Sequence, residues 1–231
     1  MAELTATELA ARLGISRRHA VELVASGTIA GRKLSSGAWL ADAASVLHYE
    51  AAARRGSGGR ISTATAWGLL WELSNLHASW LTPSTRWRVH RRLRTMSAEE
   101  IARTVSSRTR THRYRAANPS KASTELIITG RAVASLLDVG LMDDIRRVCG
   151  YLPSGGDVKG YASTHFMVED TTGLDVLYEN TVPSPVKGNV MPIAVIAADL
   201  AVSPNTRERS GGLRALEKLC QQWIEANQLQ R

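Results

Sequence analysis

The chain has 231 residues, of which 44% are apolar and 22% are charged, values typical of a soluble globular protein. This composition excludes a wholly disordered chain, a collagen-like chain and a disulfide framework. Lysine and arginine number 29 against 21 aspartates and glutamates, so the formal net charge is +8. A positive excess of this size points first to a polyanionic partner.

The start of the chain and its apolar runs predict a cytoplasmic protein with no membrane partner. The first residues lack the basic and then apolar segments of a signal peptide. The longest apolar stretch, residues 191–202, is interrupted by Asp199 and is shorter than the ~20 residues of a membrane span. Cys149 and Cys220 lack CxxC spacing and a nearby histidine. We therefore expect two reduced, buried thiols, no metal site and no cofactor.

The positive charge is concentrated in one segment of the chain. Residues 86–115 contain ten arginines and only two glutamates, a net charge of +8. Residues 1–60 have a net charge of +3, whereas residues 116–231 have a net charge of −2. This asymmetry predicts one part that faces nucleic acid and another part with a different role.

The N-terminal segment has the pattern of two helices followed by a hairpin. Thr5 and Glu8 fit a capping box at the start of a first helix, which Gly14 ends. Ser16 is a good N-cap for a second helix. Two short apolar runs flank the Ser-Ser-Gly of residues 35–37 and predict a β-hairpin. Helix, short turn and helix is the layout of a helix-turn-helix.

The second predicted helix begins with basic side chains that its apolar stripe leaves outside. In a helix-turn-helix, the first turn of the second helix meets the base edges of DNA. We assign base reading to Arg17, Arg18 and His19. We assign phosphate contacts to Ser16 and to the hairpin residues Arg32 and Lys33.

The stretch TATELAARLGISRRHAVELVASGTIAGRKLSSGAWL resembles the winged helix-turn-helix of the excisionase and MerR-like class. The features that carry the resemblance are the ELAxxLGIS start, the SGxI turn and a basic hairpin before an aromatic residue. The resemblance covers about the first fifty residues. It implies a winged helix-turn-helix fold that binds DNA.

The arginine-rich middle is predicted to be mostly helical. Helices are expected over residues 62–75, 86–96 and 97–106, and a strand with a basic face over residues 108–115. In the second of these helices, Arg88, Arg91 and Arg92 fall roughly opposite the apolar stripe. An ordinary solvated face is the alternative to a phosphate-binding one. We assign phosphate contacts to Arg86, Arg88, Arg91, Arg92 and Arg94.

The C-terminal segment has a mixed pattern of strands and helices that favours an α+β fold over alternating βαβ units. Strands are expected over residues 125–129, 165–168 and 174–178, with the last two paired as a hairpin, and helices over 130–141, 191–201 and 207–226. The nucleotide-binding and hydrolase motifs GxxxxGK[ST], GxGxxG, HExxH and GxSxG do not occur. No catalytic residue is assigned, and we expect the protein not to be an enzyme.

A second set of motifs lies in the middle and C-terminal segments. These are WLTPSTRWR followed by RRL, ITGRA at residues 128–132, Gly160-Tyr161, and ADLAVS with RER at residues 198–209. Together they resemble actinobacterial AbiEi-type antitoxins of type IV toxin–antitoxin systems. The resemblance implies an N-terminal winged helix and a C-terminal domain. It also implies repression of the protein's own promoter and antagonism of a nucleotidyltransferase-type toxin, without a stable complex being required.

The sequence thus predicts a DNA-binding transcriptional repressor of α+β class that acts as an autoregulating antitoxin. Its partners would be double-stranded DNA, with inverted repeats at its own promoter, and a cognate toxin opposed directly or indirectly. Two alternatives stay open: an excisionase-like or plasmid-maintenance accessory factor, and an enzyme acting on nucleic acid. The expected parts are a DNA-binding domain (1–55), a linker (56–60), an arginine-rich helical segment (61–115) and a C-terminal α+β domain (116–231).

Overall fold

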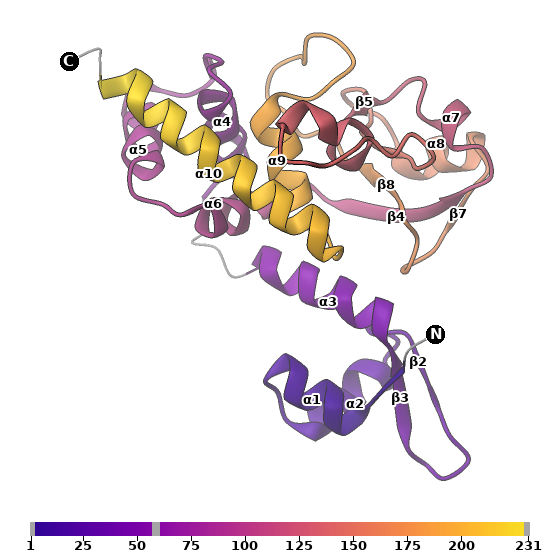
Figure 1. The fold of residues 1–231 in the computed structure, drawn as a ribbon. Coiled ribbons are helices and arrows are strands. Elements are labelled where there is room, and N and C mark those ends of the chain that lie inside the picture. The colour runs from indigo at the N-terminus through magenta and orange to yellow at the C-terminus, as the bar shows by residue number, and fades with distance from the viewer. Residues whose placement is uncertain (1–2, 57–60, 229–231) are drawn as a thin grey trace. The chain divides into compact units, whose positions relative to one another are not determined.

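The computed structural model describes residues 3–56 and 61–228 of the chain, which folds into two compact units, residues 1–53 and residues 54–231 (Figure 1). Both units combine helices with a small sheet, which confirms the α+β class predicted from the sequence. Of the predicted linker at residues 56–60, residues 57–60 lie outside the described residues. No described helix is both long and apolar enough to cross a lipid bilayer.

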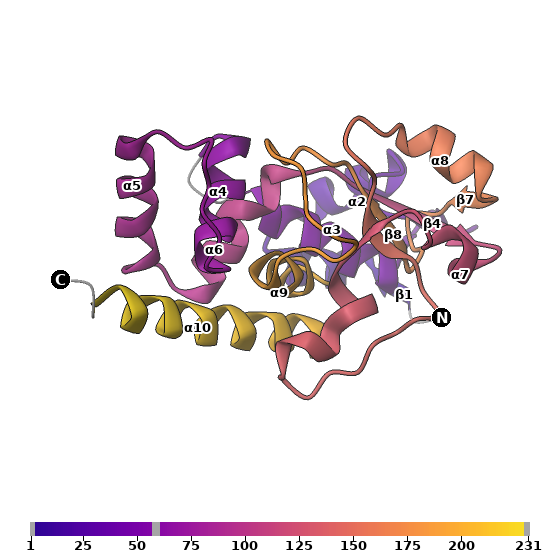
Figure 2. The ribbon, with the colours of Figure 1, turned by 90° about the horizontal axis from the view of Figure 1, so that it is seen from above.

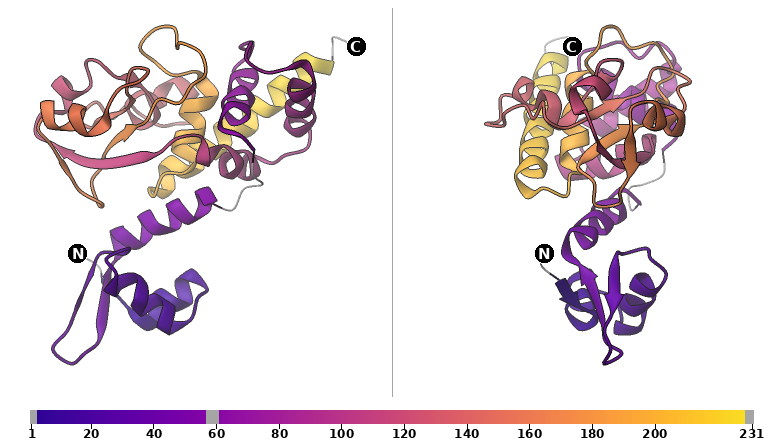
Figure 3. Two further views of the ribbon diagram at one scale, coloured as in Figure 1. Left: turned by 180° about the vertical axis from the view of Figure 1, so that it is seen from behind. Right: turned by 90° about the vertical axis from the view of Figure 1, so that its right-hand side faces the viewer.

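The first unit consists of short helices and a three-stranded antiparallel sheet with the order β1-β3-β2. The hairpin formed by β2 and β3 extends beyond the helices of this unit (Figure 3). The elements in chain order are β1 (Glu3–Thr5), α1 (Ala6–Leu13), α2 (Arg17–Ala25), β2 (Gly31–Lys33), β3 (Trp39–Asp42) and α3 (Ala43–Gly56).

The start and end of α1 and the start of α2 lie where the capping residues of the sequence predicted them. The Thr5 hydroxyl accepts a hydrogen bond from the backbone N–H of Glu8, and the Glu8 carboxylate accepts one from the backbone N–H of Thr5, so the capping box is confirmed. Gly14 ends α1 in the left-handed region at φ 65°. The Ser16 hydroxyl accepts a 3.2 Å hydrogen bond from the backbone N–H of His19 and caps α2.

The first unit has a small core of its own. Leu9 of α1, Ala20 of α2, Ile29 and Val46 of α3 are fully buried together. The buried residues of α1 are Ala6, Leu9 and Ala10, and those of α2 are Ala20, Leu23 and Val24. This spacing of three and four commits one face of each of these helices to the core and leaves the other face to solvent.

The second unit is larger and contains two cores on either side of a five-stranded sheet. Helix α10 runs along α4, α5 and α6 and beside α9 (Figure 2). The helices are α4 (Thr63–Leu73), α5 (Pro83–Leu93), α6 (Ala98–Val105), α7 (Pro119–Ala122), α8 (Val158–Thr164), α9 (Ile193–Ala201) and α10 (Thr206–Gln228). The strands are β4 (Thr111–Ala116), β5 (Ile127–Ile128), β6 (Cys149–Tyr151), β7 (Met167–Glu169) and β8 (Asp175–Tyr178).

The sheet has the order β5-β6-β8-β4-β7, and its neighbours are antiparallel except for β6 and β8. Side chains alternate across it as the period of two requires. Val176 and Tyr178 belong to the core with α4 and α9, whereas Leu177 belongs to the core with α7 and α8. Helices α4 to α6 share the first of these cores with α9 and α10. Residues 61–115 and 116–231 therefore make up one folded unit.

The predicted hairpin between residues 165–168 and 174–178 is wrong. Strands β7 and β8 do not pair with each other, because β4 lies between them and pairs with both. The connecting turn crosses β4: the backbone N–H of Asp170 donates to the carbonyl of Arg113 at 3.1 Å. Gly173 passes so close to Tyr114 that a Cβ atom there would lie 2.2 Å from the Tyr114 carbonyl oxygen.

Two helix predictions also need correction. The expected helix from residue 130 is a pair of 3₁₀ turns over Gly130–Leu137, interrupted at Val133, which has φ −138°. Helix α5 begins three residues earlier than expected, because Thr82 caps it and Pro83 occupies the first helical position. Proline lacks a backbone N–H, and at the first position of a helix that donor has no partner in any case.

Candidate nucleic-acid interface

The first turn of α2 presents three consecutive basic side chains to solvent. Arg17, Arg18 and His19 are exposed, while the opposite face of the helix is buried. Arg18 is 91% exposed and its Nε donates to Glu22 at 3.1 Å. Nδ1 of His19 lies 3.6 Å from the same carboxylate. Glu22 thus orients two of the three predicted base-reading side chains without burying them.

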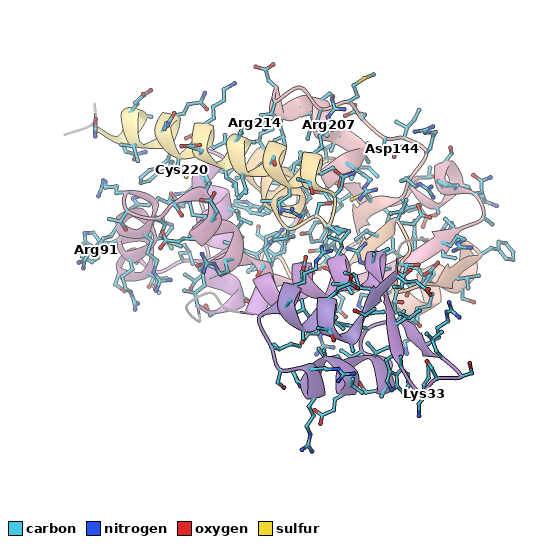
Figure 4. The ribbon with its side chains drawn as sticks, turned by 60° about the horizontal axis from the view of Figure 1, so that its bottom comes forward. Lys33, Arg91, Asp144, Arg207, Arg214 and Cys220 are labelled. Carbon is cyan, nitrogen blue, oxygen red and sulfur yellow. The ribbon has the colours of Figure 1, made fainter. Side chains whose placement is uncertain are left out.

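The hairpin carries the two remaining basic residues predicted in this unit. Arg32 makes a two-pronged ion pair with Glu3 of β1, with both N–O distances at 3.0 Å. This hydrogen bond from Arg32 lowers the pKa of the Glu3 carboxyl, and the same bond raises the pKa of Arg32. The Lys33 ammonium lies 5.9 Å from the centre of the Trp39 ring and projects from the hairpin (Figure 4). Glu3 is 29 residues from Arg32, so the spacing of residues along the chain does not reveal this partner.

The outer face of α5 carries the second group of predicted phosphate contacts. Three arginines there are exposed: Arg88, Arg91 and Arg92. Arg94, the residue that follows α5, is exposed as well, but its guanidinium lies 5.9 Å from the centre of the Trp223 ring of α10. No described carboxylate forms an ion pair with any of them. The Arg91 guanidinium lies 5.8 Å from the centre of the Trp87 ring and projects outward from the helix (Figure 4). We call Trp87 with Arg88, Arg91 and Arg92 the α5 patch.

Arg86, the fifth arginine predicted to bind phosphate, points to the other side of α5. Its Nε donates to the buried Glu72 carboxylate at 3.2 Å, and its Nη2 donates to the Ala78 carbonyl at 2.9 Å. Nε2 of His90 lies 2.8 Å from the other oxygen of Glu72. Arg86 therefore ties α5 to α4, and this contact between helices removes it from the exposed basic face.

A groove of about 400 Å³ runs between the start of α4 and the basic face of α5. Arg88 Nη2 donates to the Thr85 hydroxyl at 3.2 Å, and the hydroxyls of Ser62 and Thr65 lie 2.8 Å apart. Guanidinium groups and hydroxyls are the donors that phosphate oxygens accept from. The groove is lined by Ile61, Ser62, Thr65, Thr85, Arg88, Val89 and Arg92.

The prediction of a basic strand face over residues 108–115 is wrong at Arg108. This residue lies before β4, and its side chain is only 2% exposed. Its guanidinium forms an ion pair with Asp199 of α9 and donates to the Tyr151 hydroxyl at 3.0 Å. Its Nη1 donates to the Val105 carbonyl at 3.0 Å, and the Trp67 ring centre lies 5.0 Å away. The partners come from distant segments, which is why spacing in the sequence did not reveal them.

Burial raises the pKa of three acidic side chains in the interior of the second unit, Asp199, Cys149 and Cys220. Burial raises the pKa of the Asp199 carboxyl, against the opposing effect of Arg108 and of hydrogen bonds from Thr129 and Tyr151. Burial also raises the pKa of the Cys149 thiol to about 12 and that of Cys220 to about 11. Both cysteines are buried and unpaired, as predicted.

Within the described residues, no three histidine, cysteine, aspartate or glutamate side chains gather as a metal site would require. Comparisons with models of known protein families, with curated proteins and with solved structures find no match to this chain. The arrangement of exposed basic side chains is thus the feature from which a function can be argued.

Proposed function

We propose that the protein is a sequence-specific, double-stranded DNA-binding transcriptional repressor whose first unit is a winged helix-turn-helix. The observation that carries the proposal is the first turn of α2, where Arg17, Arg18 and His19 are exposed side by side. The major groove of B-DNA is about 12 Å wide and admits an α-helix, whose diameter with side chains is about 10–12 Å, so its edges can be reached from the first turn of α2.

Each of these side chains has a suitable chemical role at a base edge or a phosphate. An arginine can donate two parallel hydrogen bonds to guanine O6 and N7. The Ser16 hydroxyl and the start of α2 would hold a backbone phosphate, since helix N-termini favour anions. Arg32 and Lys33 on the hairpin would contact the flanking backbone or the minor groove, as a wing does.

The exposed arginines of the α5 patch would add phosphate contacts on the second unit. Together with the first unit, these supply about six contacts, which corresponds to a slope of log K against log salt of roughly −5. The ion pair with Glu3 holds Arg32 on the hairpin and offsets part of its charge.

We further propose that this repressor is an autoregulating type IV antitoxin that binds inverted repeats at its own promoter and antagonises a nucleotidyltransferase-type toxin. Support comes from the AbiEi-like motifs and from their proximity in space. Thr129 of the ITGRA motif donates to Asp199 of the ADLAVS motif at 2.7 Å. Arg131 and Ser203 donate to the same oxygen of Glu208, at 3.0 and 2.6 Å. Motif residues up to 77 positions apart thus belong to one cluster.

The test is binding of the full chain to its own upstream region and to a scrambled duplex, measured by fluorescence anisotropy at two salt concentrations. A repressor prefers the upstream region, and the preference survives higher salt. Arg17→Ala should weaken binding to the upstream region by about 1–3 kcal/mol and leave scrambled DNA nearly unchanged. Arg146→Ala, at an exposed arginine outside both basic surfaces, is the matched control.

Equal, salt-sensitive binding to both duplexes would contradict the repressor and favour an accessory DNA-binding factor. Equal loss on both duplexes for Arg17→Ala would contradict the base-reading role of this residue. The antitoxin part is tested by co-expression with the toxin encoded beside the gene. Growth should be rescued by the wild-type chain, and an absence of rescue would contradict this part alone.

A further inference from the structure

Trp87 is the most exposed aromatic side chain on any described helix of the second unit. All six tryptophans lie in the described part of the chain, and Trp87 is 61% exposed while the other five are buried or half-buried. Leaving a large apolar ring in water forgoes the stabilisation that burial would give it. A single exposed apolar side chain needs no explanation by itself. Trp87 is informative because exposed guanidinium groups lie beside it, and aromatic rings with nearby cations are a combination that binds nucleic acid.

Exposed arginines lie beside Trp87 on α5. Arg91, one helical turn later, lies 5.8 Å from the ring centre, and Arg88 is its neighbour in the chain. Because residues four apart lie on the same side of a helix, Trp87 and Arg91 form one row and Arg88 and Arg92 form the adjacent row. An aromatic surface thus lies directly beside a pair of guanidinium groups.

The row of Arg88 and Arg92 borders the groove at the start of α4. The other polar lining is made of hydroxyls from Ser62, Thr65 and Thr85. At about 400 Å³ the groove exceeds what one phosphate fills, and it can hold a phosphate with its sugar. Guanidinium and hydroxyl donors together suit phosphate oxygens.

We propose that the α5 patch binds single-stranded DNA, with an unpaired base stacked on Trp87 and the adjoining phosphate held in the groove by Arg88 and Arg92. The inference rests on the nucleic-acid role proposed for this helix and adds single-stranded DNA to the duplex phosphates as a second ligand. In a duplex, each base face is covered by its neighbours, so the indole face finds no partner there. An unpaired base offers its face, and stacking on an aromatic side chain works for any base.

The test is the affinity of the full chain for a labelled twelve-nucleotide oligothymidylate, compared with its affinity for the upstream duplex. Trp87→Ala should weaken binding of the single strand by about 5- to 150-fold and change binding of the duplex by less than about threefold. Trp87→Phe keeps an aromatic face and should recover most of the affinity. Phe166→Ala is the matched control, because Phe166 is 75% exposed in the same unit but lies outside the α5 patch.

Several outcomes would overturn the inference. One is a Trp87→Ala chain that binds oligothymidylate as tightly as the wild type does. A second is oligouridylate binding at least tenfold more tightly than oligothymidylate, which would assign the patch to RNA. A third is a polyglutamate peptide bound with the same dependence on Trp87, which would assign it to an acidic protein.

The two proposals can fail separately. Arg17→Ala should leave the single-strand affinity unchanged within about twofold, since Arg17 lies in the other unit. A wild-type chain that prefers its promoter but does not bind oligothymidylate would overturn only the present inference. A wild-type chain that binds oligothymidylate through Trp87 but shows no promoter preference would overturn only the proposed repressor.

Discussion

Arg108 and Arg91 come from the same arginine-rich segment, and their surroundings differ in every respect. Arg108 is 2% exposed, paired with Asp199 and hydrogen-bonded to Tyr151. Arg91 is exposed, lies over the ring of Trp87 and pairs with no described carboxylate. Both Nη groups of the buried Arg108 donate to protein acceptors, whereas the exposed Arg91 keeps its donors for a ligand. Within one segment, arginine therefore stabilises the fold at position 108 and stays accessible to a ligand at position 91.

The largest expected effect is on stability, at the buried member of this pair. Arg108→Met should lower the free energy of unfolding by about 3–5 kcal/mol, because it leaves the Asp199 carboxylate buried without its counter-charge. Urea denaturation measures this change. Arg103→Met, at an exposed arginine of α6, is the matched control and should change the stability by less than about 0.5 kcal/mol. An equal loss of stability for Arg108→Met and Arg103→Met would contradict a structural role that is specific to the buried arginine.

The next effect concerns Glu72, which holds the inward-facing arginine of α5. Glu72→Gln should lower the free energy of unfolding by about 1–3 kcal/mol, because Arg86 and His90 lose their charged partner. Glu225→Gln, on the exposed side of α10, is the comparison variant. A loss no greater for Glu72→Gln than for Glu225→Gln would mean that this contact does not hold α5 in place.

A third prediction concerns how the free energy of unfolding depends on pH because of the buried Cys149 thiol. The folded chain keeps the Cys149 proton up to about pH 12, whereas the unfolded chain loses it above about pH 8.5. The unfolded state then binds fewer protons, so stability falls as pH rises. Relative to Cys149→Ala, the wild type should lose about 1.4 kcal/mol per pH unit above pH 8.5. Parallel stability curves for the two chains would contradict a buried, protonated thiol.

The smallest effect on stability is expected at the exposed member of the pair. Arg91→Ala should change the free energy of unfolding by less than about 0.5 kcal/mol. It should weaken binding to all duplexes alike and reduce the slope of log K against log salt by about one. Denaturation and salt titrations of the same samples separate the two properties. A stability loss above 1 kcal/mol would show that Arg91 also serves the fold.

Much of the local structure could be predicted from the sequence. The capping box at Thr5, the N-cap at Ser16 and the helix end at Gly14 all occur as expected. The exposure of Arg17, Arg18 and His19 also followed from the apolar stripe of their helix. These features depend on interactions between residues no more than about four positions apart, so the sequence nearby contains the needed information.

What the sequence by itself determined was the α+β class, most of the helices, their caps and the basic segments. Only the tertiary structure decided that β4 separates β7 from β8, that Arg108 meets Asp199 across 91 residues, and that Arg86 turns inward to Glu72. The physical reason is that strand pairing and buried ion pairs join segments far apart in the chain. Their partners depend on how the cores pack, and periodicity along one segment does not report that packing.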